Sequence, residues 1–397
     1  MAQISNTVSK YLGFNETLTE AISLGHDIGH TPFGHVGERT LNYIMNGCYL
    51  IKDFNKNLPD NEKGFKHNWQ GIRVVSELEQ LHKEYFGLNL TDYTTWGILN
   101  HSNKKYKPCN RRSDQNICRL ILNGQKCDNE SKGGLGVDYY NRYETLFDEN
   151  SWTIEALIVS QADEIAQRHH DIEDGIEANI INTLELINVF EKCFSKYLNV
   201  SDKELVEYIK SEKDKIYYVP ALSKLVVNFL TSRLILDTTK NLTNIIKQFE
   251  INCECDFYKH KTEIKNTIGL KKIVAYCEDF KLQEEEFQKY LSKRILNSHK
   301  AQSMDGKADY IMRKLFKAYT TNPQQLPDKT IITLYRTLLD KEEFESLEQG
   351  HSSETLTGFM RDRLEKDHFN KCEDNYRIAL LRIICDYIAM FVKKVVV

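Results

Sequence analysis

Residues 25–38 read GHDIGHTPFGHVGE, and this stretch holds three of the twelve histidines and two carboxylates within 14 residues. His26 and Asp27 are expected at the end of a helix, where an adjacent imidazole and carboxylate can both reach one ion beside the helix flank. Nitrogen and oxygen ligands of this kind suit Mn, Fe, Co, Ni, Zn or Mg better than a soft metal. The stretch therefore predicts a divalent metal site.

The glycines and the proline of this stretch allow the chain to fold back on itself, so that His30, His35 and Glu38 can face the same ion. The alternative is a glycine-rich turn with incidental histidines. A single His-Asp pair would favour that alternative by about ten to one, and the whole cluster reverses those odds.

A second cluster lies in residues 161–174, which read QADEIAQRHHDIED. On a helix, one face would carry Asp163, Gln167, His170, Asp171 and Asp174. Such a face is usually a solvated charged surface. The charge-poor segment that precedes Asp163 indicates instead a half-buried carboxylate, which needs a cation as its partner.

The composition is that of an ordinary folded protein. The 397 residues carry 53 Lys+Arg and 57 Asp+Glu, a net charge of −4, which excludes a disordered chain and a generally basic nucleic-acid binder. No apolar run approaches the roughly 18 residues that cross a bilayer, and the N-terminus does not read as a signal peptide. The ten cysteines are dispersed without zinc-type pairs, so free thiols and a cytoplasmic location are expected.

The sequence predicts an all-α fold with at most short strands, because prolines are few and alternating patterns are scarce. A capping box at Thr17 is expected to open a helix that runs to about Ile28, and residues 68–86 and 153–179 show helical periodicity. Residues 103–150 are rich in loop formers. A short strand pair is expected near residues 251–258.

These motifs resemble those of the HD-domain phosphohydrolases and, more narrowly, the deoxynucleoside triphosphate triphosphohydrolases of dGTPase type. The resemblance begins with the His-Asp pair and the GHTPFGHxGE run that contains His30. It continues in order through residues 65–70, 87–91, 162–174, 313–316 and 322–326. The resemblance implies an HD catalytic core over residues 1–180, with a loop-rich insertion at about 103–150, and a helical C-terminal region over 181–397.

The family's site residues can be carried over by position. The resemblance implies a divalent ion (Mn, Mg, Co, Fe or Ni) held by His26, Asp27 and Asp163. It implies that the catalytic residues are His35, ordered by Glu38, and a second histidine, His67. Phosphate and sugar contacts are implied for His30, Gln167 and Asp171, although many relatives have an aromatic residue in place of Gln167. The reaction implied is hydrolysis of a dNTP to a deoxynucleoside and inorganic triphosphate.

Two departures from the family pattern stand out. The family's first metal-binding histidine would precede Met1, so the chain is expected to be truncated or to have a misassigned start, and to hold metal weakly. At the other end, residues 386–389 lack the glycine that follows them in the family.

Other functions stay open. They are a non-catalytic nucleotide-sensing or oligomerising protein on the same fold, or another HD phosphohydrolase such as a nucleotidase or phosphodiesterase. The resemblance also implies a homo-oligomer with no membrane partner, and some relatives bind single-stranded DNA. The pairs Arg111-Arg112 and Lys393-Lys394 are interpreted as solvated surface rather than as nucleic-acid sites.

Overall fold

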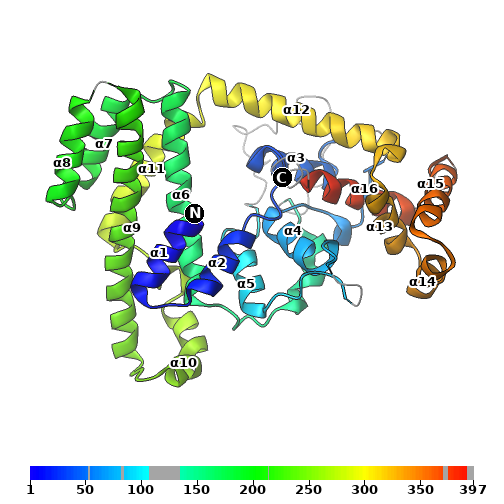
Figure 1. Cartoon of the computed structure of the whole chain (residues 1–397), viewed down its shortest axis with the longest axis horizontal. Coiled ribbons are helices and arrows are strands. Elements are labelled where there is room, and N and C mark those ends of the chain that lie inside the picture. The colour runs from blue at the N-terminus through cyan, green and yellow to red at the C-terminus, as the bar shows by residue number, and fades with distance from the viewer. Residues whose placement is uncertain (52–53, 82–84, 107–134, 213, 370–373, 391–397) are drawn as a thin grey trace. The chain divides into compact units, whose positions relative to one another are not determined.

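The computed structural model describes residues 1–51, 54–81, 85–106, 135–212, 214–369 and 374–390 (Figure 1). Every regular element in these ranges is helical, and Gln80 and Gly87 form an isolated bridge that extends into no strand. This confirms the predicted all-α fold. The basic pairs at 111–112 and 393–394 and much of the predicted loop-rich insertion lie outside the described residues.

The chain folds into two compact units, each built from three segments. Unit 1 comprises Met1–His26, Asn89–Ser102 and Phe147–Met304, and unit 2 comprises Asp27–Leu88, Asn103–Leu146 and Asp305–Val397. The two units therefore alternate along the sequence. The division at residue 180 that the sequence indicates stays a prediction.

Unit 1 is a helical bundle around one apolar core. Its core includes five phenylalanines whose ring centroids lie 5.1–5.7 Å apart, namely Phe190, Phe194, Phe229, Phe280 and Phe287. Aromatic rings at such distances stabilise a core beyond the area that they bury. The helices are α1 (Ala2–Leu12), α2 (Glu16–Gly25), α5 (Asp92–Asn100), α6 (Ile154–Glu177), α7 (Thr183–Phe194), α8 (Val200–Ser211), α9 (Lys215–Gln248), α10 (Glu254–Thr267), η5 (Leu270–Lys272) and α11 (Glu278–Ile295).

The helix α6 carries the second sequence cluster, and its residues explain its bounds. Thr153 caps the helix by accepting a hydrogen bond from the Ala156 amide at 3.2 Å, and the last turn ends at Glu177. The buried face includes Ile158, Ala162 and Ile165 and packs on α1, α2, α5 and α9. The predicted helix over 153–179 is confirmed, and its polar face is left to carry Asp163 and Asp171.

Unit 2 forms a second core around its C-terminal helix, α16. The elements are α3 (Gly34–Met45), η1 (Asp60–Glu62), α4 (His67–Arg73), the π-helical turn η2 (Val74–Leu78), η4 (Asp138–Leu146), η6 (Pro323–Gln325), α13 (Asp328–Leu338), α14 (Lys341–Gly350), α15 (Ser353–Phe369) and α16 (Asp374–Ala389). The helix α12 (His299–Thr321) starts in unit 1 and continues into unit 2. Leu41, Phe65 and Ile384 are fully buried in this core.

A buried ionic network ties α4 to α16. The Arg73 guanidinium donates to Asp386 Oδ2 from Nε and Nη2 at 3.0 and 2.9 Å, and the Gln70 amide donates to Asp386 Oδ1 at 2.9 Å. All three side chains are buried. Because a buried charge is stable only when it is paired, this network fixes the helix that begins at His67.

Close packing at Gly29 brings the turn after α2 against the first turn of α4. A Cβ atom at Gly29 would lie 2.1 Å from the His67 carbonyl oxygen and 2.2 Å from the Gly71 amide nitrogen. Only glycine allows the two backbones to approach so closely. The approach places His30, the next residue, beside His67.

Three local predictions were wrong. Asn15, and not Thr17, caps α2, because its side chain accepts from the Leu18 amide at 3.0 Å, and α2 ends at Gly25. The periodic stretch at 68–86 is not one helix, since α4 passes into the π-helical turn that ends at Leu78. Residues 251–258 form no strand pair, because α10 begins at Glu254.

One helix among the described residues is long and apolar enough to cross a membrane by length and composition alone. It spans residues 216–248 of α9, and 44% of its apolar window is buried. Leu222, Val226 and Leu234 of this helix are fully buried in the core of unit 1. Core helices of folded proteins pass the same test, so α9 alone gives weak evidence for a membrane.

Candidate active site

Unit 1 brings His26 and Asp163 together across α2 and α6. His26 Nε2 lies 3.5 Å from Asp163 Oδ1, and both side chains are partly buried. His26 Nδ1 donates a hydrogen bond to the Ser23 carbonyl at 2.8 Å, so the lone pair of the neutral ring is on Nε2, the nitrogen that faces Asp163. A backbone acceptor on the second ring nitrogen is the usual arrangement for a metal-ligating histidine.

His101, at the end of α5, repeats this arrangement next to His26. Its Nδ1 donates to the Ile98 carbonyl at 2.7 Å, and its backbone carbonyl accepts from Ser160 of α6 at 2.6 Å. The His26 and His101 rings meet edge to face, with centroids 5.2 Å apart. Nothing in the sequence distinguishes His101, because one histidine at a helix end forms no motif.

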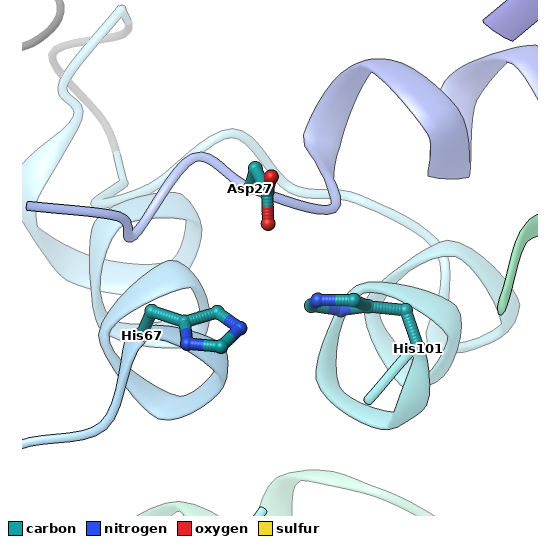
Figure 2. A group of neighbouring side chains, drawn as sticks. All are labelled: Asp27, His67 and His101. Atoms are coloured by element: carbon teal, nitrogen blue, oxygen red, sulfur yellow. The ribbon is translucent and has the colours of Figure 1, made fainter. Parts of the chain in front are cut away.

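In unit 2, Asp27 and three histidines from the opening stretch and α4 gather in one place. Figure 2 shows Asp27 on the loop after α2 and His67 on the first turn of α4, and it also shows His101 at the end of α5. His30 Nε2 lies 3.4 Å from Asp27 Oδ1, and the His30 ring stacks on the His67 ring at 4.0 Å. His35 is exposed and meets both rings edge on, at 5.3 and 6.0 Å.

The Glu38 carboxylate is the most buried polar group of this cluster, with 1% of the residue exposed. Its Oε1 accepts from Lys66 Nζ at 2.7 Å and from the Tyr106 hydroxyl at 2.8 Å. Its Oε2 accepts from the His67 amide at 3.1 Å and also from His67 Nδ1. The sequence prediction paired Glu38 with His35, whereas its partners among the described residues are these three.

The pKa values of the cluster follow from burial and from this ion pair. Burial lowers the pKa of His67 to about 4, against the opposing effect of Glu38. Burial would raise the pKa of Glu38, but the hydrogen bond and charge of His67, followed by the charge of Lys66, hold it well below its usual range. Burial also lowers the pKa of His30. At neutral pH the cluster therefore combines an ionised Glu38 with a neutral His67.

The site residues on α6 lie on its solvent-accessible side. Gln167 is exposed, and Asp171 is partly buried, which raises the pKa of its carboxyl group. Asp163 and Asp171 are eight residues apart, which corresponds to roughly 12 Å along a helix. This length is comparable with the extent of a nucleotide, so one bound nucleotide could contact both residues.

Two sets of side chains are candidate cation sites. One is His30, Glu38 and His67, and the other is His26 and Asp163. His30, Glu38 and His67 have ligand atoms within 4.8 Å of one another. However, the Lys66 ammonium already supplies the positive charge that Glu38 requires. Within the described part of the chain, Asp163 has a histidine within 4 Å and forms no ion pair with a lysine or arginine, so the donor set at His26 and Asp163 fits a divalent cation better.

One cavity of unit 2 is lined by a different set of side chains. It has a volume of about 1720 Å³, and its lining includes residues of α13 to α16 together with Arg73 and Tyr139. None of the predicted site residues lines it. Side-chain chemistry, rather than cavity size, therefore locates the candidate site.

Acid sensitivity provides one test of the His67 environment. The pKa of His67 is about 4 in the fold and about 6.5 in an unfolded chain. A lowered pKa adds stability above the unfolded value, and this contribution is lost as the pH falls through that window. Between pH 7 and pH 5 we expect metal-free protein to lose roughly 2 kcal/mol more stability than His67→Gln, measured by urea unfolding. Equal losses in both proteins would contradict the burial argument.

The comparison with known families agrees with this geometry. Residues 1–168 match the HD domain, a range that contains His26, Asp27, Glu38, His67 and Asp163. Residues 1–168 are therefore similar to an HD domain. Residues 274–340 of the same chain match the phosphohydrolase-associated domain.

Curated relatives that match this chain carry the name deoxyguanosinetriphosphate triphosphohydrolase-like protein. The relative from Geobacter metallireducens is 28% identical over 329 residues, which cover 83% of this chain and 69% of the relative. The relative from Leptospira interrogans is 27% identical over 341 residues, with the same coverages, and the relative from Bordetella pertussis is 26% identical over 329 residues, 82% and 70% of the two chains. These matches confirm the family resemblance read from the sequence.

The two matched domains support a metal-dependent phosphohydrolase. HD domains bind divalent metals, and the donors at His26 and Asp163 of this chain fit such an ion. These donors do not distinguish one divalent metal from another.

Lys66 and Tyr106, the partners of Glu38, could not be identified from the sequence, because no motif connects them to Glu38.

Proposed function

We propose that this protein hydrolyses deoxynucleoside triphosphates to a deoxynucleoside and inorganic triphosphate. The observation that carries the proposal is the approach of His26 to Asp163 at 3.5 Å, which joins two sequence clusters 137 positions apart (163 − 26) into one donor set. The names of the relatives support the choice of substrate. His26, Asp27 and Asp163 would hold a divalent ion, which lowers the pKa of bound water and neutralises phosphate charge.

The histidine cluster supplies proton transfer in this proposal. His67 is held by Glu38 through Nδ1, so its Nε2 is the basic nitrogen and can accept a proton from the attacking water. His35 is exposed at the edge of the cluster and can return a proton to the leaving 5′-oxygen of the sugar. His30 would contact a phosphate oxygen, as the resemblance implies.

The face of α6 beyond Asp163 would position the nucleoside. Asp171 accepts a hydrogen bond from the sugar 3′-hydroxyl in this proposal, and Gln167 lies between the two acids on the same face. A homo-oligomer, a cytoplasmic location and single-stranded DNA as a further partner stay predictions of the resemblance.

A substrate panel tests the proposal. Purified protein with added Mn²⁺ should release triphosphate from dNTPs, and excess EDTA should stop the reaction. Release of phosphate from nucleoside monophosphates instead would favour the nucleotidase alternative. No turnover of any substrate would favour the nucleotide-sensing alternative.

A further inference from the structure

Lys66 and Tyr106 hold one oxygen of Glu38, and His67 holds the other. The Oε1 atom lies 2.7 Å from Lys66 Nζ and 2.8 Å from the Tyr106 hydroxyl. The Oε2 atom receives the amide and Nδ1 hydrogen bonds of His67. Each carboxylate oxygen therefore has two donors, and the carboxylate cannot rotate without breaking at least two hydrogen bonds.

Water screens this arrangement very little. The side chains of Glu38 and Lys66 are only 2% and 9% exposed. Burying a carboxylate is costly unless a cation and further donors compensate it. Among the described residues, Lys66 is the only lysine or arginine that forms an ion pair with Glu38, so it supplies this compensation.

The chain path explains why one segment can hold both oxygens. Lys66 has an extended backbone, with φ −150° and ψ 130°, and His67 is the first residue of α4. Because consecutive residues on an extended backbone point in different directions, Lys66 and His67 reach different oxygens of the same carboxylate. The helix terminus adds the His67 amide as a fourth donor, where a negative charge is favoured.

Tyr106 completes the arrangement from a different part of the chain. Its hydroxyl also lies 3.0 Å from the Phe65 carbonyl, and Lys66 Nζ lies 4.9 Å from the centre of its ring. Burial raises the pKa of Tyr106 far above its usual range, so the hydroxyl stays protonated and donates. Tyr106 thus contacts both members of the Glu38–Lys66 ion pair.

We propose that Lys66 and Tyr106 are positioning residues that fix Glu38 and, through it, the Nδ1–H tautomer and ring orientation of His67. The inference rests on the proposed function, in which His67 Nε2 accepts a proton. Neither residue touches substrate in this account. They act by keeping the basic nitrogen of His67 aimed in one direction.

The direct test is ¹⁵N NMR of histidine-labelled, metal-free protein at pH 7, with the His67 signals assigned from His67→Gln. In the wild type we expect a single neutral tautomer, with the proton on Nδ1. In Lys66→Met and Tyr106→Phe we expect mixed or exchange-averaged His67 signals, and Lys66→Arg should restore the single tautomer. An unchanged His67 tautomer in both Lys66→Met and Tyr106→Phe would overturn the inference.

Lys261→Met is the matched control. Lys261 is also a buried lysine, 6% exposed, but it lies in unit 1 among the rings of Tyr93, Trp152 and Tyr258. Its loss removes a buried ammonium without touching Glu38, so the His67 signals should not change. If Lys261→Met altered them as Lys66→Met does, general destabilisation would explain the effect and the inference would fail.

Kinetics give the second readout. We expect Lys66→Met to lower kcat about 10- to 100-fold with little change in KM, because misplacing a catalytic group by about 1 Å costs up to this much. Lys66→Arg should recover most of the rate. If the wild type did not hydrolyse dNTPs, the proposed function would be refuted. The NMR result would still show whether Lys66 and Tyr106 fix the tautomer of His67. An active wild type with unchanged His67 signals in the variants would refute the positioning alone.

Discussion

Replacing Asp163 with alanine should remove bound metal and lower dNTP hydrolysis by about 10³-fold or more. Asp163 is the carboxylate that faces His26 at 3.5 Å, and without it the proposed donor set loses one of its two carboxylates. A bound cation contributes several kcal/mol to such reactions, and each 1.36 kcal/mol corresponds to a factor of ten. Elemental analysis of the purified protein and a Mn²⁺ titration would measure the metal directly.

Asp174→Ala is the matched control for this prediction. Asp174 lies on the same helix and is exposed, three turns beyond Asp163. It should keep both metal content and activity. If Asp163→Ala retained wild-type metal content, the ion would be held elsewhere and the assignment of His26 and Asp163 would be wrong.

Replacing His67 with glutamine should lower kcat by about 10²- to 10⁴-fold while metal content stays unchanged. Loss of a general acid or base typically costs this much. The glutamine amide can still donate to Glu38, so the ion pair with Lys66 keeps a partner on both oxygens. Steady-state rates of triphosphate release, measured beside metal analysis, would separate lost proton transfer from lost metal.

Two further variants complete that test. His260→Gln removes a partly exposed histidine on α10 that pairs with Glu263, and it should leave kcat unchanged. His35→Ala should lower kcat by a similar factor to His67→Gln if both residues transfer protons, again with metal retained. A wild-type rate in His67→Gln together with a large loss in His35→Ala would move the basic role to His35.

The sequence was sufficient for features that depend on local pattern. Thr153 followed by a regular apolar spacing predicted α6 closely, because the cap and the buried face lie on one continuous segment. The half-buried state of Asp163 followed from the charge-poor residues before it. The approach of His26 to Asp163 could be expected because the motif resemblance had already linked their clusters.

Contacts between residues that are far apart in the sequence could not be predicted from the sequence alone. Glu38 takes its partners from Lys66 and Tyr106, which are 28 and 68 residues away, and no spacing rule brings them together. The Asp386 that anchors α4 lies 313 residues from Arg73. The place of His101 beside His26 depends on the packing of α5 against α2 and α6, which the sequence does not show.

Local signals also competed with one another. In residues 251–258, Ile251, Cys253 and Phe257 alternate with polar residues, which is typical of a strand. The acidic residues Glu254 and Asp256 occupy the first turn of α10, where a negative charge stabilises a helix. The helix also buries Ile264 in the core of unit 1, and this burial decides the competition.

The identity of the phosphorus product tests the central claim most directly. Wild-type protein, Mn²⁺ and dGTP would be followed by ³¹P NMR in water enriched in ¹⁸O. The account predicts intact triphosphate with one ¹⁸O atom on its terminal phosphorus that was the α-phosphorus of dGTP, and unlabelled deoxyguanosine. Pyrophosphate with dGMP, stepwise release of phosphate, or unreacted dGTP would contradict it.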